Sequence, residues 1–301
     1  MLSIIVCTYN RDQYIYQCLS NLAINQTHGA WEIVLVNNNS TDDTHNECER
    51  FRKDYPYVNV HYFIEQKAGL SYARNRGIKE AHGDWFVFLD DDSMVDIDYL
   101  ENLSSHLENH PEIDAFGGSI EPFFEGENPD WLSKWSMGFV SAIDMGNRIR
   151  PFAKGKYPIG ANMGISRKVI EQVGDFNTSL GRTKELLLGG EEKDMFMRIH
   201  NAGKLIYYFP NIRVKHCIPP KRMTLQYIKK LGYGVGASES IRTRQIGNIA
   251  YFKRLVLELI KWCGTLILWL GYAICLQSPK GNILVLFRYN VTKGLLDSIN
   301  A

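Results

Sequence analysis

The sequence predicts an α/β fold: a mostly parallel sheet flanked by helices, followed by a helical C-terminal extension. Strand-like and helix-like patterns alternate over residues 1–90, polar clusters directly follow three of the strands, and the composition turns basic and apolar after about residue 220. Alternation of strand and helix implies right-handed crossovers between parallel strands. We therefore expect an α/β domain over residues 1–220 and a helical C-terminal region over residues 221–301.

The predicted strands of the N-terminal part are short apolar runs rich in β-branched and aromatic residues. They are Leu2–Cys7, Glu32–Val36, Val58–Phe63 and Trp85–Leu89. Segments with helical spacing or helix-capping residues separate these runs. They are Tyr14–Leu22, the segment that begins after Thr41-Asp42-Asp43, and Leu70–Ala81, which Gly83 follows.

The residues beyond the fourth predicted strand show fewer regular patterns. Residues 121–158 contain four prolines and several glycines, which indicates long loops of a kind that is often functional. A helix is expected to start near Arg167. Another is expected over Glu191–Ala202, where Asp194 and Arg198 have the i, i+4 spacing of an ion pair. Two strand-like runs follow, at Leu205–Phe209 and Ile212–Val214.

Composition excludes one broad class of function and favours a reducing compartment. The 301 residues include 34 Lys and Arg against 33 Asp and Glu, without the basic excess of a nucleic-acid-binding protein. The six cysteines form no CxxC pair, which predicts reduced, mostly buried thiols and no zinc site. The run after Met1 lacks the basic region and cleavage site of a secretory signal. We therefore expect the protein in the cytoplasm or at the cytoplasmic face of a membrane.

Three polar clusters come directly after predicted strands. They are Thr8-Tyr9-Asn10, Asn37-Asn38-Asn39-Ser40 and Asp90-Asp91-Asp92. Ligands of open α/β sheets bind outside the carboxyl ends of the strands, so these clusters are expected to line one crevice. Three adjacent carboxylates repel one another unless a cation lies between them, and hard oxygen ligands favour Mg²⁺ or Mn²⁺. A solvated acidic turn that caps a helix is the alternative.

Two further segments carry candidate site residues. Gly69 precedes a helix start that can hold an anion, and Arg74 can reach a diphosphate from there, although a plain amphipathic helix explains the same pattern. Gly189-Gly190 lets the backbone approach a ligand before Glu191 and Glu192, either of which can serve as a catalytic general base. The alternative is that these two carboxylates only stabilise a helix N-terminus.

Taken in order, these segments resemble the motifs of the family 2 glycosyltransferases, which have the GT-A fold. The resemblance covers about residues 1–240. Its segments are Ser3–Arg11, Val36–Asp42, Gly69–Gly77, Phe88–Asp92, Gly160–Met163, Gly190–Asp194 with Arg198 and Gly203, and Val214–His216. It implies transfer of a sugar from a nucleoside-diphosphate sugar with inversion, to a glycan or lipid-linked acceptor. Polysaccharide or glycoconjugate synthesis is the expected setting.

The resemblance also implies roles for residues on the donor side. Thr8 and Asn38 would contact the nucleotide base, and Asp91 would contact the ribose. Asp90 and Asp92 would hold the metal and the diphosphate. Asn37 and Asn38 stand where many members have two aspartates, which leaves the identity of the base open.

On the acceptor side, the resemblance gives the role of general base to Glu192, where many members have Asp. His216 is a candidate metal ligand, although a single histidine after a strand is more often structural. Two other functions remain as alternatives. They are sugar-phosphate nucleotidyl transfer, for which the loop after the first strand lacks the usual Gly-rich pattern, and non-catalytic binding of a nucleotide sugar.

The C-terminal region predicts peripheral membrane association. Its uncharged run, residues 262–276, is shorter than the ~20 residues that span a bilayer. Basic residues of this region can meet anionic lipid. They are Lys221, Arg222, Lys229, Lys230, Arg242, Arg244, Lys253 and Arg254. A buried core helix and a homodimer contact are the alternatives.

Overall fold

The computed structural model describes residues 1–25, 27–153, 155–182 and 187–297. The chain divides into two compact units. The first comprises Met1–Phe123, Ser141–Asn177 and Glu192–Cys217. The second comprises Phe124–Val140, Thr178–Glu191 and Ile218–Ala301.

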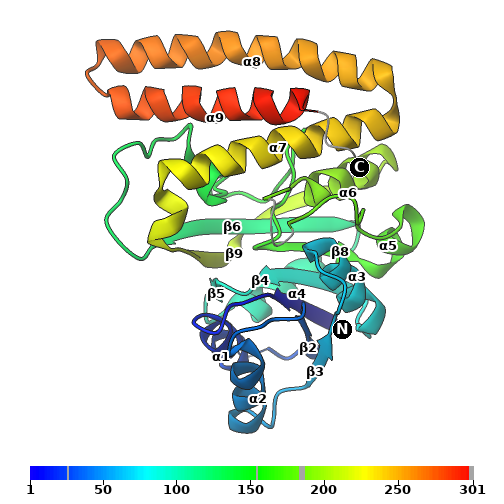
Figure 1. Cartoon of the computed structure of the whole chain (residues 1–301). Helices are drawn as coiled ribbons and strands as arrows, with labels where there is room; N and C mark the ends of the chain where they lie inside the picture. Colours follow the sequence, from blue (N-terminus) through cyan, green and yellow to red (C-terminus); the bar gives the residue numbers. More distant parts are fainter. Residues whose placement is uncertain (26, 154, 183–186, 298–301) are drawn as a thin grey trace. The chain divides into compact units, whose positions relative to one another are not determined.

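The first four strands form the parallel part of a sheet, as predicted. They are β1 (Leu2–Thr8), β2 (Trp31–Asn37), β3 (Val60–Ile64) and β4 (Trp85–Asp90). Their order is β3-β2-β1-β4, so β1 lies between β2 and β4 (Figure 1). In register, Thr8 lies opposite Asn37 and Cys7 lies opposite Asp90. The carboxyl ends of three parallel strands therefore meet at one edge.

The sheet continues beyond β4 with antiparallel pairings. The added strands are β8 (Met163–Ser166), β6 (Ala115–Phe124), β9 (Ile206–Ile218) and β5 (Ser93–Val95), with β7 (Arg150–Pro151) paired to β9. The two strands predicted between 205 and 214 are one continuous strand, β9. Pro210 and Asn211 resemble a break in the sequence, yet β9 runs through both of them. The α/β fold with C-terminal helices is confirmed, and its sheet is mixed.

Helices cover both faces of this sheet because successive strand residues point to opposite sides. Ile4 packs with α1 (Ile15–Ala23), α2 (Thr44–Asp54) and α4 (Tyr99–Asn109). Ile5, the next residue, packs on the other face with α3 (Leu70–Glu80), α5 (Arg167–Val173) and α6 (Glu191–Asn201). Two apolar clusters therefore hold the strand ends in place.

The second unit is mainly helical. It contains α7 (Leu225–Ile246), α8 (Asn248–Ile274) and α9 (Ser278–Leu296), with short 3₁₀ turns at Met137–Val140 and Pro220–Met223. α9 packs on both α7 and α8 and lies between them (Figure 1). Residues 124–140, predicted as loop, pack here too: the Phe139 ring stacks on Phe287 with centroids 4.2 Å apart. Within the described residues, α8 is the one helix long and apolar enough to cross a membrane.

Candidate active site

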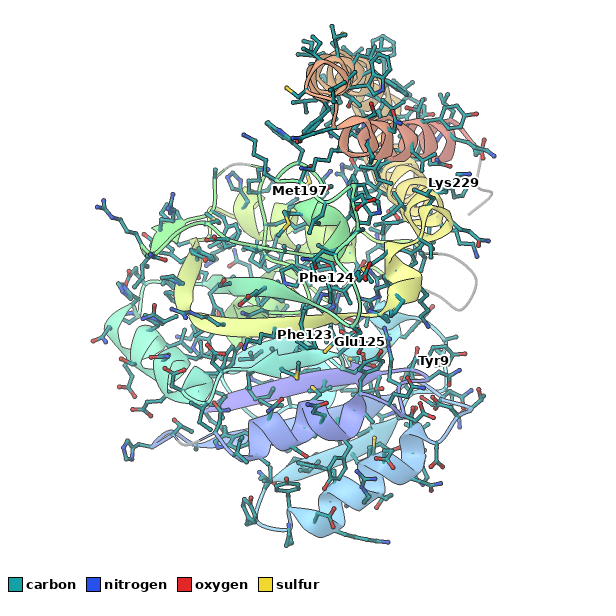
Figure 2. All side chains as sticks on the ribbon, turned by 90° about the vertical axis from the view of Figure 1, so that its left-hand side faces the viewer. Tyr9, Phe123, Phe124, Glu125, Met197 and Lys229 are labelled. Carbon is teal, nitrogen blue, oxygen red and sulfur yellow. The ribbon has the colours of Figure 1, made fainter. Side chains whose placement is uncertain are left out.

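The predicted polar clusters lie together at the carboxyl edge of the parallel strands. The backbone N–H of Asn38 donates to the carbonyl of Thr8 at 2.8 Å, which joins the ends of β1 and β2. Asn10 has a positive φ of 51°, and its side-chain oxygen accepts a hydrogen bond from the N–H of Thr41 at 2.8 Å. Tyr9, which is labelled in Figure 2, stands between Thr8 and Asn10 in the sequence of this turn. The first two clusters thus form one connected wall.

The side chain of Asn38, which was predicted to contact a nucleotide base, makes three hydrogen bonds within the protein. Its amide nitrogen donates to the carbonyls of Glu65 and Lys67 at 3.0 and 2.7 Å. Its amide oxygen accepts from the N–H of Gly69 at 2.8 Å. The structure therefore gives Asn38 a positioning role: it fixes the loop that leads into α3 and Arg74.

The acidic cluster, which consists of Asp90, Asp91 and Asp92, offers ligand atoms that can bind a divalent cation. Asp90, Asp92 and His216 each offer one ligand atom, and these atoms lie within 4.8 Å of one another. Asp92 Oδ1 is 3.0 Å from His216 Nε2, and both side chains are buried. Two carboxylates and an imidazole suit Mn²⁺ well, and Mg²⁺ through the carboxylates. The pairing of β5 with β9 brings His216 opposite Ser93, next to Asp92.

Arg11 is a site residue that the sequence analysis did not single out. Its Nε lies 3.4 Å from Asp91 Oδ1 and its Nη2 lies 3.3 Å from Asp92 Oδ2. A basic residue directly after the first polar cluster was the available signal. Burial raises the pKa of Asp91 to about 7, the Arg11 guanidinium opposes that rise, and the charge of Asp92 adds to it. One fixed cation thus partly offsets the repulsion within the cluster.

Arg74 joins the acidic cluster to Glu192. Its buried guanidinium has Nη2 3.8 Å from Asp90 Oδ1 and 3.3 Å from Glu192 Oε1. Gly160 lies directly against this pair, because a Cβ atom there would overlap the Arg74 guanidinium and press on the Glu192 carboxylate. The glycine in this segment therefore makes room for the ion pair, which sequence reasoning did not foresee.

The two candidate bases at the start of α6 are in different surroundings. Glu191 is only 2% exposed and belongs to the second unit, whereas the Glu192 side chain is 17% exposed and belongs to the first. The predicted i, i+4 pair is confirmed, with Arg198 Nε 2.9 Å from Asp194 Oδ2. Asp194 is thereby committed to α6 itself. Glu192 is held against Arg74, with Oε1 3.3 Å from Nη2.

Asn162, from the same segment as Gly160, has a structural function. Its amide nitrogen donates to the carbonyls of Ser119 and Ile212 at 3.0 and 2.8 Å. Its oxygen accepts from the Tyr99 hydroxyl at 2.8 Å. All these partners belong to the first unit. Asn162 therefore ties the segment that carries Gly160 to the antiparallel strands.

Comparison with known proteins identifies the family. The profile described as "Glycosyl transferase family 2" matches residues 3–174. The chain is 24% identical to the glucosyl-dolichyl phosphate glucuronosyltransferase of Haloferax volcanii, over 79% of this chain and 76% of that protein. It is 28% identical to the succinoglycan biosynthesis protein ExoM of Rhizobium meliloti, over 81% of this chain and 78% of that protein.

A solved structure shows the same architecture. The fold is similar to that of the mannosyltransferase PcManGT from Pyrobaculum calidifontis, solved in complex with GDP-Man and Mn²⁺. The TM-score is 0.65 at 17% sequence identity, and the match covers 99% of this chain and 87% of that one. Because the family profile spans more than half of the chain and the fold agrees, the chain belongs to glycosyl transferase family 2 and is a glycosyltransferase of the GT-A fold.

Proposed function

We propose that this enzyme transfers a sugar, with inversion, from a nucleoside-diphosphate sugar to a hydroxyl group of a glycan or lipid-linked acceptor. The reaction would serve surface polysaccharide or glycoconjugate synthesis at the cytoplasmic face of a membrane. One observation carries the proposal: Arg74 lies between Asp90 of the acidic cluster and Glu192 at the start of α6. A donor-binding carboxylate and a candidate base thus share one cation.

The donor would bind along the acidic cluster. Asp90 and Asp92, with His216, would hold Mg²⁺ or Mn²⁺, and the ion would neutralise the charge of the diphosphate. Thr8, Asn38 and Asp91 would contact the nucleoside, with Tyr9 and Asn10 in the adjoining turn. Arg74 would add a direct hydrogen bond to the departing diphosphate.

Glu192 would act as the general base. The acceptor oxygen forms a bond to the anomeric carbon while the bond from that carbon to the diphosphate oxygen breaks. The proton of the acceptor hydroxyl passes to Glu192, and the nucleoside diphosphate leaves. Arg74 positions the Glu192 carboxylate, since their atoms lie 3.3 Å apart and Gly160 leaves them room.

The relatives support an extended or lipid-linked acceptor. One is named for transfer to a glucosyl-dolichyl phosphate, and another for succinoglycan synthesis. Both names describe sugar transfer or glycan assembly beyond a single soluble sugar. We infer the acceptor class of this enzyme from them.

The test uses the purified full-length chain with UDP-, GDP-, dTDP- and CDP-sugars, Mn²⁺, and a lipid extract as the source of acceptor. Release of nucleoside diphosphate together with labelled glycan or lipid supports the proposal. Release of pyrophosphate would instead support nucleotidyl transfer. Binding without turnover of any donor would support a non-catalytic protein.

The assignment of the base is tested by Glu192→Gln, with Glu191→Gln as the neighbouring control. Glu192→Gln keeps the size of the side chain and removes its basicity, so turnover should fall by roughly 10²-fold or more while nucleotide binding persists. Normal turnover in Glu192→Gln, with Glu191→Gln inactive, would assign the role of general base to Glu191 instead.

A further inference from the structure

Helix α8 exposes large apolar side chains along its whole length. Six of them, between 63% and 75% exposed, form what we call the outer stripe: Ile249, Phe252, Leu259, Ile260, Ile267 and Ile274. Apart from the adjacent pair Leu259 and Ile260, their separations are three and seven residues, and at about 100° per residue all six fall on one side of the helix. Exposed apolar patches of this extent are uncommon on monomeric soluble proteins and mark contact surfaces.

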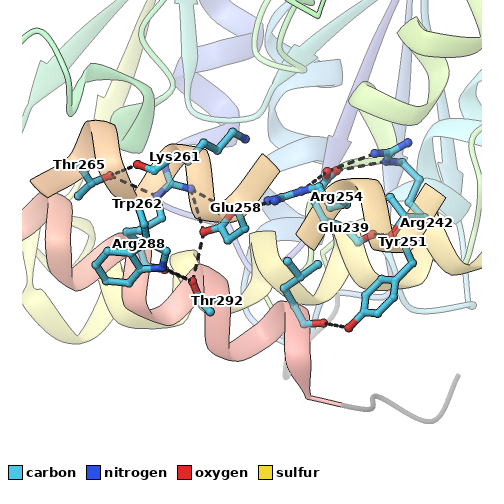
Figure 3. A network of polar contacts seen from close by, with 12 residues as sticks. Glu239, Arg242, Tyr251, Arg254, Glu258, Lys261, Trp262, Thr265, Arg288 and Thr292 are labelled. Carbon is cyan, nitrogen blue, oxygen red and sulfur yellow. Dashed lines mark hydrogen bonds and ion pairs between the residues drawn. The ribbon is translucent and has the colours of Figure 1, made fainter. Parts of the chain in front are cut away.

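The opposite side of α8 is polar and buried. Arg254 Nη1 lies 2.7 Å from Glu258 Oε2, and Arg254 Nε lies 3.0 Å from Glu239 Oε2 of α7 (Figure 3). Arg288 of α9 completes the network, with Nη1 3.2 Å from Glu258 Oε1. The helix thus turns its Arg254–Glu258 pair toward α7 and α9 and its apolar stripe outward, the reverse of a helix on the surface of a water-soluble protein.

The exposed charges of these helices have one sign. The residue ranges of α7, α8 and α9 hold two acids, Glu239 and Glu258, and both are buried. Their exposed charged residues are all basic: Lys229, Lys230, Arg244, Lys253, Lys261 and Lys293. Lys229 is labelled on α7 in Figure 2. An exposed apolar stripe whose neighbouring exposed charges are all positive suits a partner with an apolar interior and an anionic surface.

We propose that α8 binds an anionic lipid bilayer, with its outer stripe among the acyl chains and the cations of α7–α9 against the headgroups. Three basic residues that the sequence analysis included, Arg222, Arg242 and Arg254, are buried and do not contribute to this surface. A second copy of the chain is a poorer partner, because two like-charged helix faces would repel. The inference adds a binding surface to the proposed function, and its test does not depend on turnover.

The geometry favours a helix that lies in the plane of the membrane. The 27 residues of α8 extend ~40 Å, yet Lys253, Arg254, Glu258 and Lys261 all lie at or before its midpoint. The length and composition of α8 as a whole meet those of a membrane span, but its charge-free remainder alone is shorter than a bilayer requires. The outer stripe runs along the whole of α8, so a helix that lies in the plane of the membrane buries the entire stripe. A helix that spans the bilayer would instead carry these charged residues into the hydrocarbon.

The first test is flotation of the full-length protein with vesicles of phosphatidylcholine and phosphatidylglycerol. The triple variant Ile260→Ser, Ile267→Ser, Ile274→Ser should bind at least ~100-fold more weakly. The matched control changes three exposed apolar residues of the first unit, Tyr57, Ile64 and Ile97, to serine and should bind as the wild type does. Vesicles of phosphatidylcholine alone should bind the wild type at least ~10-fold more weakly.

Two results would overturn the proposal. One is equal vesicle binding by the wild type and the outer-stripe variant. The other is a wild-type protein that does not bind vesicles but is shown by light scattering to be a dimer, while the outer-stripe variant is a monomer. That pattern would make the stripe a contact between copies.

A fluorescent label on Cys263 tests the orientation. Cys263 and Cys275 are the exposed cysteines of the described residues, so Cys275→Ser leaves Cys263 as the accessible thiol on α8. Lipid quenchers placed near the headgroups should quench this label more strongly than quenchers placed near the bilayer centre. Stronger quenching from the centre would contradict an in-plane helix.

Discussion

At the scale of single residues, the site is an arrangement of few charges in a buried setting. Arg11 contacts Asp91 and Asp92 within the acidic cluster, and Arg74 contacts both Asp90 of that cluster and Glu192. The acids stay close to one another because each has a cation or an imidazole beside it. Removal of one charge should therefore leave a neighbouring buried charge without its partner and should weaken ligand binding and the fold together.

Asp92→Asn tests the metal site. It keeps the shape of a buried side chain and removes the charge that faces His216, so Mn²⁺ should bind at least ~10-fold more weakly. Calorimetry with Mn²⁺ and a nucleoside diphosphate measures the loss. Asp98→Asn, on an exposed acid six residues further along, should leave the affinity unchanged. An unaltered metal requirement in Asp92→Asn would remove Asp92 from the site.

Gly160→Ala tests the space beside Arg74 and Glu192. The added methyl group would overlap the guanidinium and displace the ion pair, so turnover should fall by about 10-fold or more. Gly138→Ala, where a Cβ meets no atom within 4 Å, should behave as the wild type in the same assay. Equal turnover in the two variants would show that the position of the Arg74–Glu192 pair is not limiting.

At the scale of elements, one buried carboxylate holds together the amino ends of three strands. Glu32 of β2 accepts from the Ser3 hydroxyl of β1 at 2.6 Å and from the N–H of His82 at 2.7 Å, just before β4. His82 and His61 also place ring nitrogens 3.0 and 3.3 Å from its second oxygen. Burial raises the pKa of Glu32, but the hydrogen bonds from Ser3 and His82 outweigh it and lower that pKa.

Because its pKa is lowered on folding, Glu32 stabilises the protein above its unfolded-state pKa, and this stabilisation is lost as the pH falls through the folded-state value. Glu32→Gln should lower the free energy of unfolding by ~1–3 kcal/mol at pH 7. Urea unfolding followed from neutral to acid pH should show the difference from wild type shrinking. Glu49→Gln, in the exposed pair with Arg52, should cost ~0.5 kcal/mol or less. A difference that stays constant with pH would contradict this account.

At the scale of the whole molecule, nucleotide and metal should stabilise the fold together. A ligand at 100 times its dissociation constant adds ~2.7 kcal/mol to the free energy of unfolding. Thermal unfolding with UDP, GDP, dTDP or CDP should show a large rise in Tm for one base, and only with Mn²⁺ present. Chelation by EDTA should reverse it. Equal shifts for all four bases, or shifts without metal, would contradict the proposed donor site.

The sequence predicted the parallel strands, most helix positions and the meeting of three polar clusters, because these follow from local periodicity and chain direction. It did not reveal Arg11 beside Asp91 and Asp92, or Gly160 beside Arg74. Those contacts join residues far apart in the chain, and no local pattern encodes them. The continuity of β9 through Pro210 was also missed, since proline usually interrupts a strand.

Because the exposed charges of the C-terminal helices are all positive, the charge of the protein is unevenly distributed, which the isoelectric point does not reveal. The whole chain has a net charge of +1, so the excess of cations after residue 218 must be balanced by an excess of acids before it. Near its isoelectric point of about 7.6, such a polar molecule should be retained by both cation-exchange and anion-exchange resins at low ionic strength. Uniformly distributed charge would give weak retention on either resin. Because salt screens the attraction of both the basic and the acidic regions to a resin, moderate salt should release the protein from each resin.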